Sequence, residues 1–383
     1  MPIPECALRV LAVEGFFGAS HAAFLEGLAA RSAYDWRLLT LPARRWRDRM
    51  LKGHKRIAQE AARLDEQFDL LFVTDMVDFA GLLELLPGGL AGLPSVFYFH
   101  ENQLTYPVRR AGEDYWQFGL LNITSAMAAD RVLFNSEFHR RAFLDAMPGF
   151  LESLPVGVTR PPGAVRRIAG RGTVAHPGID VDGFPCPDRS GRVGPLTILW
   201  NHRWEHDKRP EVFFDALDGL VSAGCDFRVV ICGENFSRRP EVFDRAREAL
   251  GERLLHFGFA ESRSEYAELL GRADVVVSTA AHEFFGIAWL EACAAGCMPL
   301  LPDRLSYPGL VPQDLHQKCI YGDDREFFQR LRELCADPAP ARKASATWRA
   351  VAERYAWSRQ AAVFDQLFAE AAGGRQVGGR EEG

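Results

Sequence analysis

Short apolar runs alternate with longer segments of helical periodicity along most of the chain. Uninterrupted runs of this kind are typical of strands that are buried on both faces of a parallel sheet. The predicted strands cover residues 7–13, 69–73, 95–99 and 131–134 in the first half, and 196–200, 227–232, 254–257, 274–278 and 298–301 in the second. Because helical segments separate these strands, the pattern predicts parallel sheets with helices on both faces. We therefore expect an α/β protein with two doubly wound, Rossmann-like domains.

The boundary between the two predicted domains lies in a loop-rich stretch. Residues 177–195 contain four prolines and four glycines, which interrupt regular structure. We place the first domain at residues 1–185 and the second at residues 186–353. Helical periodicity then dominates, over residues 324–336, 340–353 and 357–371. The tail, residues 373–383, is polar and rich in glycine, and is predicted to be disordered.

Length and composition fit a two-domain globular protein. The chain has 383 residues, too many for one ordinary core, with 48% hydrophobic and 25% charged residues. Its net charge of −6 argues against a general nucleic-acid coat protein. We find no basic leader and no apolar run of membrane-spanning length, so we expect a cytoplasmic protein without a membrane partner. The eight cysteines show neither C-x-x-C nor zinc-ligand spacing, which favours reduced thiols.

Two carboxylates flank a glycine that opens a helix. Glu283 lies in the loop after the strand at 274–278, and Glu291 lies within the helix that follows Gly286. Eight helical steps span about 12 Å, which roughly matches the distance from a sugar across a diphosphate to a ribose. A helix N-terminus suits a phosphate, and carboxylates suit pairs of sugar hydroxyls. The spacing is also compatible with an ordinary amphipathic helix that exposes two glutamates.

Two cations strengthen the interpretation of a nucleotide-sugar site. Arg203 and Lys208 follow the strand at 196–200, in a loop that ends where Pro210 opens a helix. The carboxyl edge of a parallel sheet is where open α/β sheets bind ligands. Arginine and lysine both suit a diphosphate and could stabilise its charge as it departs. A solvated surface pair is the alternative.

The first domain has two polar segments that follow strands. Glu14-Gly-Phe-Phe-Gly-Ala-Ser-His21 carries glycines that allow close approach to a ligand, although it lacks the G-x-G-x-x-G pattern of dinucleotide sites. His100-Glu-Asn-Gln103 follows the strand at 95–99 and groups four polar side chains at its end. His100 could donate to a sugar hydroxyl or a phosphate, or could instead satisfy a loop carbonyl. Ser136, after the strand at 131–134, suits a helix N-cap.

Together these motifs resemble the tRNA-queuosine α-mannosyltransferase family, within the retaining E-x7-E glycosyltransferases of family 4 type. The resemblance covers residues 7–370 and rests most specifically on His100-Glu-Asn-Gln103 and Asn201-His-Arg-Trp-Glu205. It implies a GT-B fold, in which two Rossmann-like doubly wound domains face a cleft. It also implies a GDP-mannose donor, no metal or other cofactor, and a queuosine-bearing tRNA anticodon as acceptor. A helix at residues 354–372 would cross back to the first domain.

The resemblance also implies roles for individual residues. Glu283 would hold hexose hydroxyls, Glu291 the ribose, and Arg203 with Lys208 the diphosphate, while His100 would line the sugar site. The catalytic set is therefore His100, Arg203, Lys208 and Glu283. The donor-binding set is Gly18, Ser20, Gly233, Glu234, Gly258, Phe259, Phe285, Gly286, Ile287 and Glu291, with the base between the loops at 233–234 and 258–259. The acceptor-binding set is His21, Glu101, Asn102, Gln103, Arg44, Arg45, Trp46 and Arg47.

A basic segment in the first domain is consistent with an RNA acceptor. Residues 44–56 hold seven Arg or Lys side chains together with Trp46. Cations interleaved with an aromatic ring suit RNA phosphates and an unstacked base. A second basic stretch contains Arg160, Arg166, Arg167 and Arg171. Both could equally be solvated surfaces.

Two other functions remain open at this point. One is a related glycosyltransferase that acts on a small molecule, a glycan or a lipid. The other is a non-catalytic module that binds a nucleotide sugar or RNA. The basic segment favours RNA over a metabolite, and residues 44–56 hold too few large apolar side chains for a membrane-surface helix. The sequence does not determine the oligomeric state.

Overall fold

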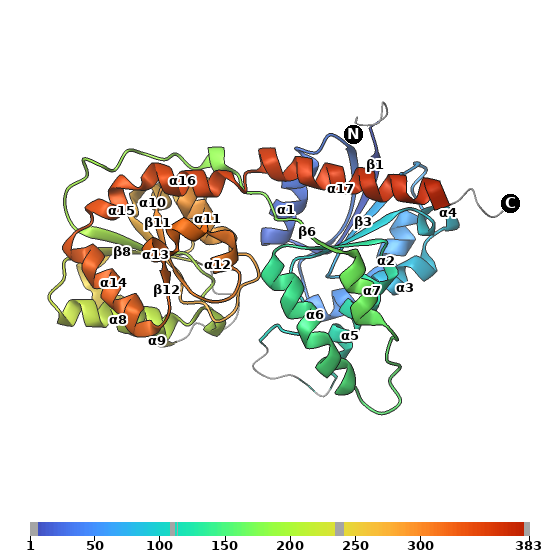
Figure 1. The fold of residues 1–383 in the computed structure, drawn as a ribbon, viewed down its shortest axis with the longest axis horizontal. Coiled ribbons are helices and arrows are strands. Elements are labelled where there is room, and N and C mark those ends of the chain that lie inside the picture. Colours follow the sequence, from blue (N-terminus) through green and yellow to red (C-terminus); the bar gives the residue numbers. More distant parts are fainter. Residues whose placement is uncertain (1–6, 108–111, 113, 234–240, 379–383) are drawn as a thin grey trace. The chain divides into compact units, whose positions relative to one another are not determined.

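The chain forms two compact α/β units. A computed structural model describes residues 7–107, 112, 114–233 and 241–378. Unit 1 runs to Gly178 and resumes at Trp357, and unit 2 comprises Ile179–Ala356 (Figure 1). The boundaries predicted from the sequence, after residues 185 and 353, differ from these by a few residues. In unit 2, Ile179 N–H donates to the Tyr355 carbonyl at 2.9 Å, which ties the two ends of that unit together.

Unit 1 is built on a six-stranded parallel sheet in the order β2-β1-β3-β4-β5-β6. Its strands are β1 (Arg9–Phe17), β2 (Asp35–Pro42), β3 (Leu70–Thr74), β4 (Ser95–Phe99), β5 (Arg131–Phe134) and β6 (Gly172–Val174). Its helices are α1 (Ala19–Ala29), α2 (Trp46–Ala61), α3 (Phe79–Leu85), α4 (Gly88–Ala91), α5 (Trp116–Ala128), α6 (Glu137–Glu152), α7 (Ala164–Arg171) and α17 (Trp357–Gly378).

Alternate residues of these strands enter two separate cores, one on each face of the sheet. Val10 and Ala12 pack with α1 and α17, including Phe24 of α1. Leu11 and Val13 face the opposite core, to which α2, α3, α5, α6 and α7 contribute. Figure 1 shows α17, the last helix of the chain, lying along unit 1 beside α1. Both faces are covered, as the continuous apolar runs predict.

Unit 2 is built on a second six-stranded parallel sheet, in the order β12-β11-β10-β7-β8-β9. Its strands are β7 (Leu196–Trp200), β8 (Phe227–Cys232), β9 (Leu254–Gly258), β10 (Val275–Val277), β11 (Met298–Pro302) and β12 (Ile320–Tyr321). Its α-helices are α8 (Pro210–Ser222), α9 (Glu241–Leu250), α10 (Arg263–Arg272), α11 (Ile287–Ala294), α12 (Tyr307–Leu310), α13 (His316–Cys319), α14 (Asp324–Ala336), α15 (Ala339–Lys343) and α16 (Ser345–Glu353). The described residues of this unit also form the 3₁₀ turns η1 (Val181–Gly183), η2 (His206–Lys208), η3 (Gly251–Arg253) and η4 (Gln313–Leu315).

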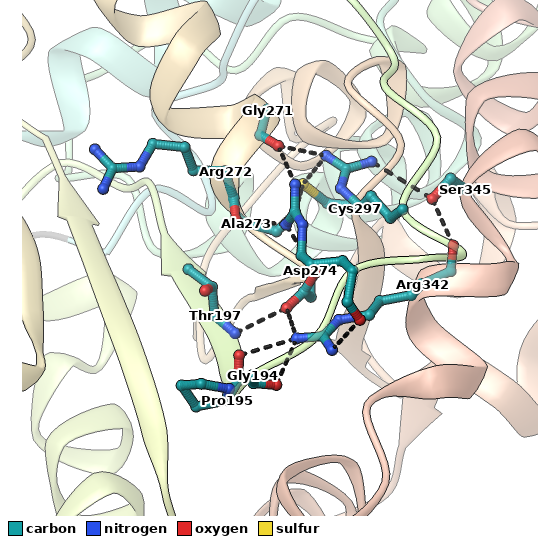
Figure 2. Close-up of polar contacts among 12 residues, drawn as sticks. Gly194, Pro195, Thr197, Gly271, Arg272, Ala273, Asp274, Cys297, Arg342 and Ser345 are labelled. Carbon is teal, nitrogen blue, oxygen red and sulfur yellow. Dashed lines mark hydrogen bonds and ion pairs between the residues drawn. The ribbon is translucent and has the colours of Figure 1, made fainter.

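A buried ionic cluster fixes the start of unit 2 against its sheet (Figure 2). Asp274, just before β10, is fully buried and pairs with Arg192 at 2.9 Å and with Arg342 at 3.0 Å. Arg342 also donates to the carbonyls of Gly194 and Pro195, immediately before β7. Both guanidinium groups pair with the one Asp274 carboxylate, so the buried anion is not left uncompensated. It thereby holds the loop before β7 in place.

Three short or half-exposed strands were missed by the sequence prediction. In β2, burial alternates along the strand, so there is no continuous apolar run to find. The strands β6 and β12 have only three and two residues. The helix expected at 340–353 is divided at Ala344 into α15 and α16. The tail also differs from the disorder expected for residues 373–383, since α17 continues to Gly378 and only residues 379–383 lie outside the described part.

Candidate active site

Lys208 and Glu283 meet at the carboxyl edge of the sheet in unit 2. The loop after β7 ends in η2, which carries Lys208, and the loop after β10 carries Glu283. Lys208 Nζ donates to the His282 carbonyl at 2.8 Å and to Glu283 Oε2 at 3.3 Å, and it lies 3.1 Å from Asp207 Oδ2. Lys208 is 6% exposed. Two loops predicted separately from the sequence therefore form one charged centre.

The electrostatics keep this centre ionised. Burial opposes charge on Glu283, yet the Lys208 ammonium outweighs it and holds the pKa of that carboxyl below its usual value. Burial similarly opposes charge on Lys208, but Glu283 and Asp207 raise the pKa of the ammonium. Arg203 is more open, since its side chain is 46% exposed and lies 3.6 Å from Glu205. The pair predicted to hold a diphosphate thus consists of one buried and one exposed cation.

Two neutral histidines flank the charged centre. Burial and the nearby Lys208 lower the pKa of His202 to about 4 and that of His282 to about 4. Both imidazoles are therefore uncharged at neutral pH, so they add no further positive charge beside Lys208. The sequence prediction included neither residue, although each directly adjoins a predicted site residue.

The N-terminus of α11 has the glycine geometry that the sequence indicates. Gly286 adopts φ 92°, and a Cβ there would lie 2.8 Å from the Trp289 ring. Ile287 begins the helix, so its backbone belongs to the first turn. Phe285 is 3% exposed and packs against Tyr355, with ring centroids 5.6 Å apart. Its side chain therefore belongs to the core, and only its backbone is available to a donor.

Glu291 is held by a hydrogen-bond network that the sequence did not predict. Its two carboxylate oxygens accept from Arg263 and from the Tyr266 hydroxyl, each at 3.0 Å. Tyr266 also accepts from Asn201 Nδ2 at 3.0 Å. Burial raises the pKa of Glu291, against the opposing effect of Arg263. A Tyr three residues after an Arg on α10 gives no sequence signal for this arrangement.

Two loops beside this network carry the residues predicted to hold a base. Gly233 N–H donates to the Gly258 carbonyl at 2.9 Å, so the loops after β8 and β9 meet. A Cβ at Gly233 would lie 2.0 Å from the His202 carbonyl oxygen, which explains the glycine. Phe259 is 62% exposed, unusual for a large aromatic side chain. Glu234 lies outside the described residues.

Unit 1 has its own polar centre, in which Glu14, His21 and His100 converge. Glu14 is fully buried; its Oε2 lies 3.2 Å from His21 Nδ1 and 3.7 Å from His100 Nε2. The two imidazole rings have centroids 4.1 Å apart. Burial acts to lower the pKa of His21, but Glu14 raises it to about 9. Burial and the His21 charge hold the pKa of His100 well below its usual value.

Asp75 organises the loop that carries His100. Its carboxylate accepts the backbone N–H groups of His100 at 3.1 Å and Glu101 at 3.2 Å. Burial raises the pKa of Asp75 to about 8. Neither Asp75 nor Glu14 was among the predicted site residues, although both stand at the carboxyl ends of predicted strands, where such residues gather.

Two of the predicted acceptor residues serve the fold of this loop. Asn102 is fully buried, and its Oδ1 accepts the backbone N–H groups of Leu104 and Thr105. Gln103 is 5% exposed and donates to the Glu101 carboxylate at 2.8 Å. Their polar side chains thus have partners within the fold, and Gln103 also orients the Glu101 carboxylate.

The glycine-rich turn after β1 brings the backbone close to its neighbours. A Cβ at Gly18 would lie 2.6 Å from that of Ala43, so a side chain would not fit without a shift. Ser20 is exposed in the first turn of α1. These two residues are accessible to a ligand, and His21 follows them directly.

The basic segment forms the exposed start of α2. Arg44, Arg45 and Arg47 are exposed, whereas Trp46 is half-buried and packs against Phe118 at a centroid distance of 4.9 Å. Trp46 is thus part of a small apolar cluster rather than a free stacking surface. In the second basic stretch, Arg160 and Arg171 donate to backbone carbonyls within unit 1, and Arg166 and Arg167 are exposed.

Comparison with known proteins shows which class of enzyme the chain belongs to. Residues 189–349 match the family model for glycosyl transferases group 1. Sucrose-phosphate synthase from Thermosynechococcus elongatus has a similar fold, with a TM-score of 0.70 and 15% identity over 96% of this chain and all of that one. Anabaena HepE in complex with UDP and glucose gives a TM-score of 0.63 with 16% identity over 96% and 100% of the two chains. The chain is a glycosyltransferase with the GT-B fold.

The family follows from the sequence matches. Residues 9–179 match the N-terminal domain model of tRNA-queuosine alpha-mannosyltransferase. The tRNA-queuosine alpha-mannosyltransferase of Drosophila melanogaster is 36% identical over 88% of this chain and 89% of its own length. A GDP-mannose-dependent alpha-(1-6)-phosphatidylinositol dimannoside mannosyltransferase of Mycobacterium tuberculosis is 31% identical over 51% and 52% of the two chains. The chain belongs to the tRNA-queuosine α-mannosyltransferase family. None of the helices in the described part of the chain is long and apolar enough to cross a membrane.

Proposed function

We propose that this protein transfers mannose from GDP-mannose to queuosine in the tRNA anticodon, in the cytoplasm and with retention at the anomeric carbon. The structural observation that carries the proposal is the part-buried contact of Lys208 with Glu283, at 3.3 Å, beside the first turn of α11. It joins a cation suited to a phosphate to a carboxylate suited to sugar hydroxyls. The specific donor and acceptor follow from family membership.

Groups of unit 2 would hold the diphosphate, the ribose and the base of the donor. Lys208 and Arg203 would neutralise the diphosphate, and would stabilise the charge that grows on it as the sugar departs. Glu283 would accept hydrogen bonds from the hexose. Glu291, already oriented by Tyr266 and Arg263, would accept them from the ribose. Exposed Phe259 would stack on the base.

No metal ion or other cofactor is required in this proposal. The two cations supply the charge that a divalent ion supplies in metal-dependent phosphate chemistry. In unit 1, His100 and His21 would contact the reacting sugar and the acceptor. The exposed arginines at the start of α2 would bind RNA phosphates, which position the tRNA without reading its sequence.

The proposal is tested by mass spectrometry of tRNA nucleosides. Queuosine-containing and queuosine-free tRNA would be incubated with GDP-mannose, GDP-glucose or UDP-glucose, with and without EDTA. We expect a hexosylated queuosine only from queuosine-tRNA with GDP-mannose, at a rate that EDTA does not change. Transfer to a free metabolite or glycan instead of tRNA would refute the acceptor, and EDTA inhibition reversed by manganese would refute metal independence. Glu283→Gln serves as the inactive control, and Glu326→Gln, on α14, as the matched active one.

A further inference from the structure

One buried carboxylate in unit 1 has no role in the proposed reaction so far. Glu14 lies within β1 and is fully buried. Its Oε1 accepts the Phe16 N–H at 2.6 Å, and its Oε2 faces His21 Nδ1 at 3.2 Å. A buried carboxylate is costly unless a positive charge and hydrogen bonds compensate it. The backbone N–H fixes one oxygen, which leaves the other to interact with the imidazole.

We propose that Glu14 is a positioning residue that keeps His21 a cation, so that His21 presents its second N–H, at Nε2, to a hydroxyl oxygen of the acceptor. Glu14 holds the Nδ1 proton, as carboxylates do for the orienting nitrogen of many functional histidines. In the described part of the chain, no protein group bonds His21 Nε2. An imidazolium donates from both nitrogens, and its hydrogen bonds are stronger than those of the neutral ring. This inference deepens the proposed mannosyl transfer and rests on it.

The groups around His21 and His100 favour a charged ring at His21 and a neutral ring at His100. Glu101 adds negative potential at His21, so the cation is favoured from the loop after β4 as well as from β1. Asp75, whose pKa is raised to about 8, adds to this potential only once it ionises in mild alkali. The ring centroids of His100 and His21 are 4.1 Å apart, so protonation of both rings would place like charges in contact. The buried Nε2 of His100 has no hydrogen-bond partner among the described residues, and 3.7 Å separates it from Glu14. His100 therefore stays neutral and can bond a sugar hydroxyl.

The same three side chains could in principle bind a divalent ion. Glu14 Oε2, His21 Nδ1 and His100 Nε2 lie within 4.8 Å of one another, and two histidines with a glutamate are a known zinc ligand set. A metal would require a deprotonated Nδ1 and both imidazoles aimed at one point. The two imidazole rings instead lie over one another at a tilt of 41°. This arrangement fits a proton held between Glu14 and His21 better than a metal ion held by all three side chains. Metal binding is thus an alternative that the experiment must separate.

The charge of His21 can be measured without substrate. Long-range ¹H–¹⁵N spectra of the full-length protein would be recorded across pH, and His21→Gln would identify the His21 signals among the ten histidines. We expect His21 to remain protonated up to about pH 9 in the wild type. In Glu14→Gln, which keeps the shape but loses the charge, its pKa should fall below about 6.5. A His21 that is neutral at pH 7 in the wild type would overturn the proposal.

Activity provides the second readout. Across about pH 6 to 8, His21 stays protonated in the wild type, so its titration should not change kcat/KM. In Glu14→Gln, kcat/KM should decline about tenfold per pH unit above the lowered pKa of His21. A purely structural role would lower activity equally at every pH. Stoichiometric zinc binding that is lost in His21→Gln would also overturn the proposal. Failure of the proposed function would appear differently, as an absence of transfer with the His21 titration intact.

Discussion

Lys208 and Arg203, the two cations after β7, differ in burial, and their variants separate stability from binding. Lys208 supports the buried Asp207 carboxylate and the part-buried Glu283 carboxylate, so Lys208→Ala should lower the free energy of unfolding by about 3–5 kcal/mol. The side chain of Arg203 is 46% exposed, and Arg203→Ala should cost less than about 0.5 kcal/mol. Each variant should reduce turnover by about 10²–10³-fold. Urea unfolding and steady-state kinetics measure the two effects, and equal stabilities for the two variants would contradict this account.

The two glutamates that flank Gly286 should affect different parts of the donor. Glu291→Gln removes the charge held by Tyr266 and Arg263, so it should weaken the binding of GDP itself by about tenfold. Glu283→Gln should leave GDP affinity nearly unchanged and impair the turnover of GDP-mannose. Isothermal titration with GDP and with GDP-mannose distinguishes the two. If both variants lose GDP affinity equally, the assignment of Glu283 to the hexose and Glu291 to the ribose is wrong.

Among the secondary-structure elements, continuous apolar runs located strands with the greatest accuracy. The bounds of β4, β5, β7 and β8 agree with the sequence prediction at both ends. In these strands both faces are buried, so every residue contributes to the signal. The edge strand β2 has a half-exposed pattern and was missed, because partial burial leaves polar residues within the strand. Burial on both faces thus decides which strands a sequence reveals.

The exposed arginines at the start of α2 allow a test of the proposed RNA interface. Replacement of Arg44, Arg45 and Arg47 by Ala should make the salt dependence of tRNA affinity shallower, by about one unit of log–log slope for each phosphate that is no longer neutralised. GDP-mannose binding should not change, because these residues belong to unit 1. A matched control replaces Lys318, Arg325 and Arg332, which are exposed on α13 and α14. Filter binding across a salt series gives the slopes, and similar slopes for both triple variants would show that α2 is an ordinary solvated surface.

For the whole molecule, the sequence indicated where functional side chains gather but not how they pair. Both polar centres stand at the carboxyl ends of parallel strands, as the apolar runs and the residues after them predict. The contact of Glu14 with His21 and the network of Asn201, Tyr266 and Glu291 were not predicted. These contacts join residues on different elements, and neither spacing nor periodicity in one element specifies a partner on another. Pairing depends on sheet register and on side-chain conformation, which only the folded structure shows.

The two units should respond to pH in opposite directions. In unit 2, His202 and His282 have folded pKa values of about 4, below the unfolded value of about 6.5. The unfolded state therefore binds more protons than the folded one in that window, and stability present above about pH 6.5 is lost as pH falls toward 4. The expected loss is on the order of 1 kcal/mol per pH unit for each histidine.

Unit 1, in contrast, should lose stability as pH rises. His21, at about 9, and Asp75, at about 8, both hold protons that the unfolded chain releases at lower pH. Their contribution to stability is therefore lost as pH rises toward 9. On the acidic side, the depressed pKa of His100 destabilises the folded unit, but protonated Asp75 offsets it above about pH 4.

Hydrogen–deuterium exchange at pH 4.5, 6.5 and 8.5, corrected for intrinsic rates, would resolve the two units in one sample. We expect peptides of unit 2 to lose protection first in acid, and peptides of unit 1 to lose it first in mild alkali. His202→Asn with His282→Asn should remove the acid sensitivity of unit 2 and leave the alkaline response of unit 1 intact, because those histidines lie in unit 2 alone. Simultaneous loss of protection in both units at each pH would mean that the two sheets unfold as one cooperative body, and that these histidines do not set the pH limits of either.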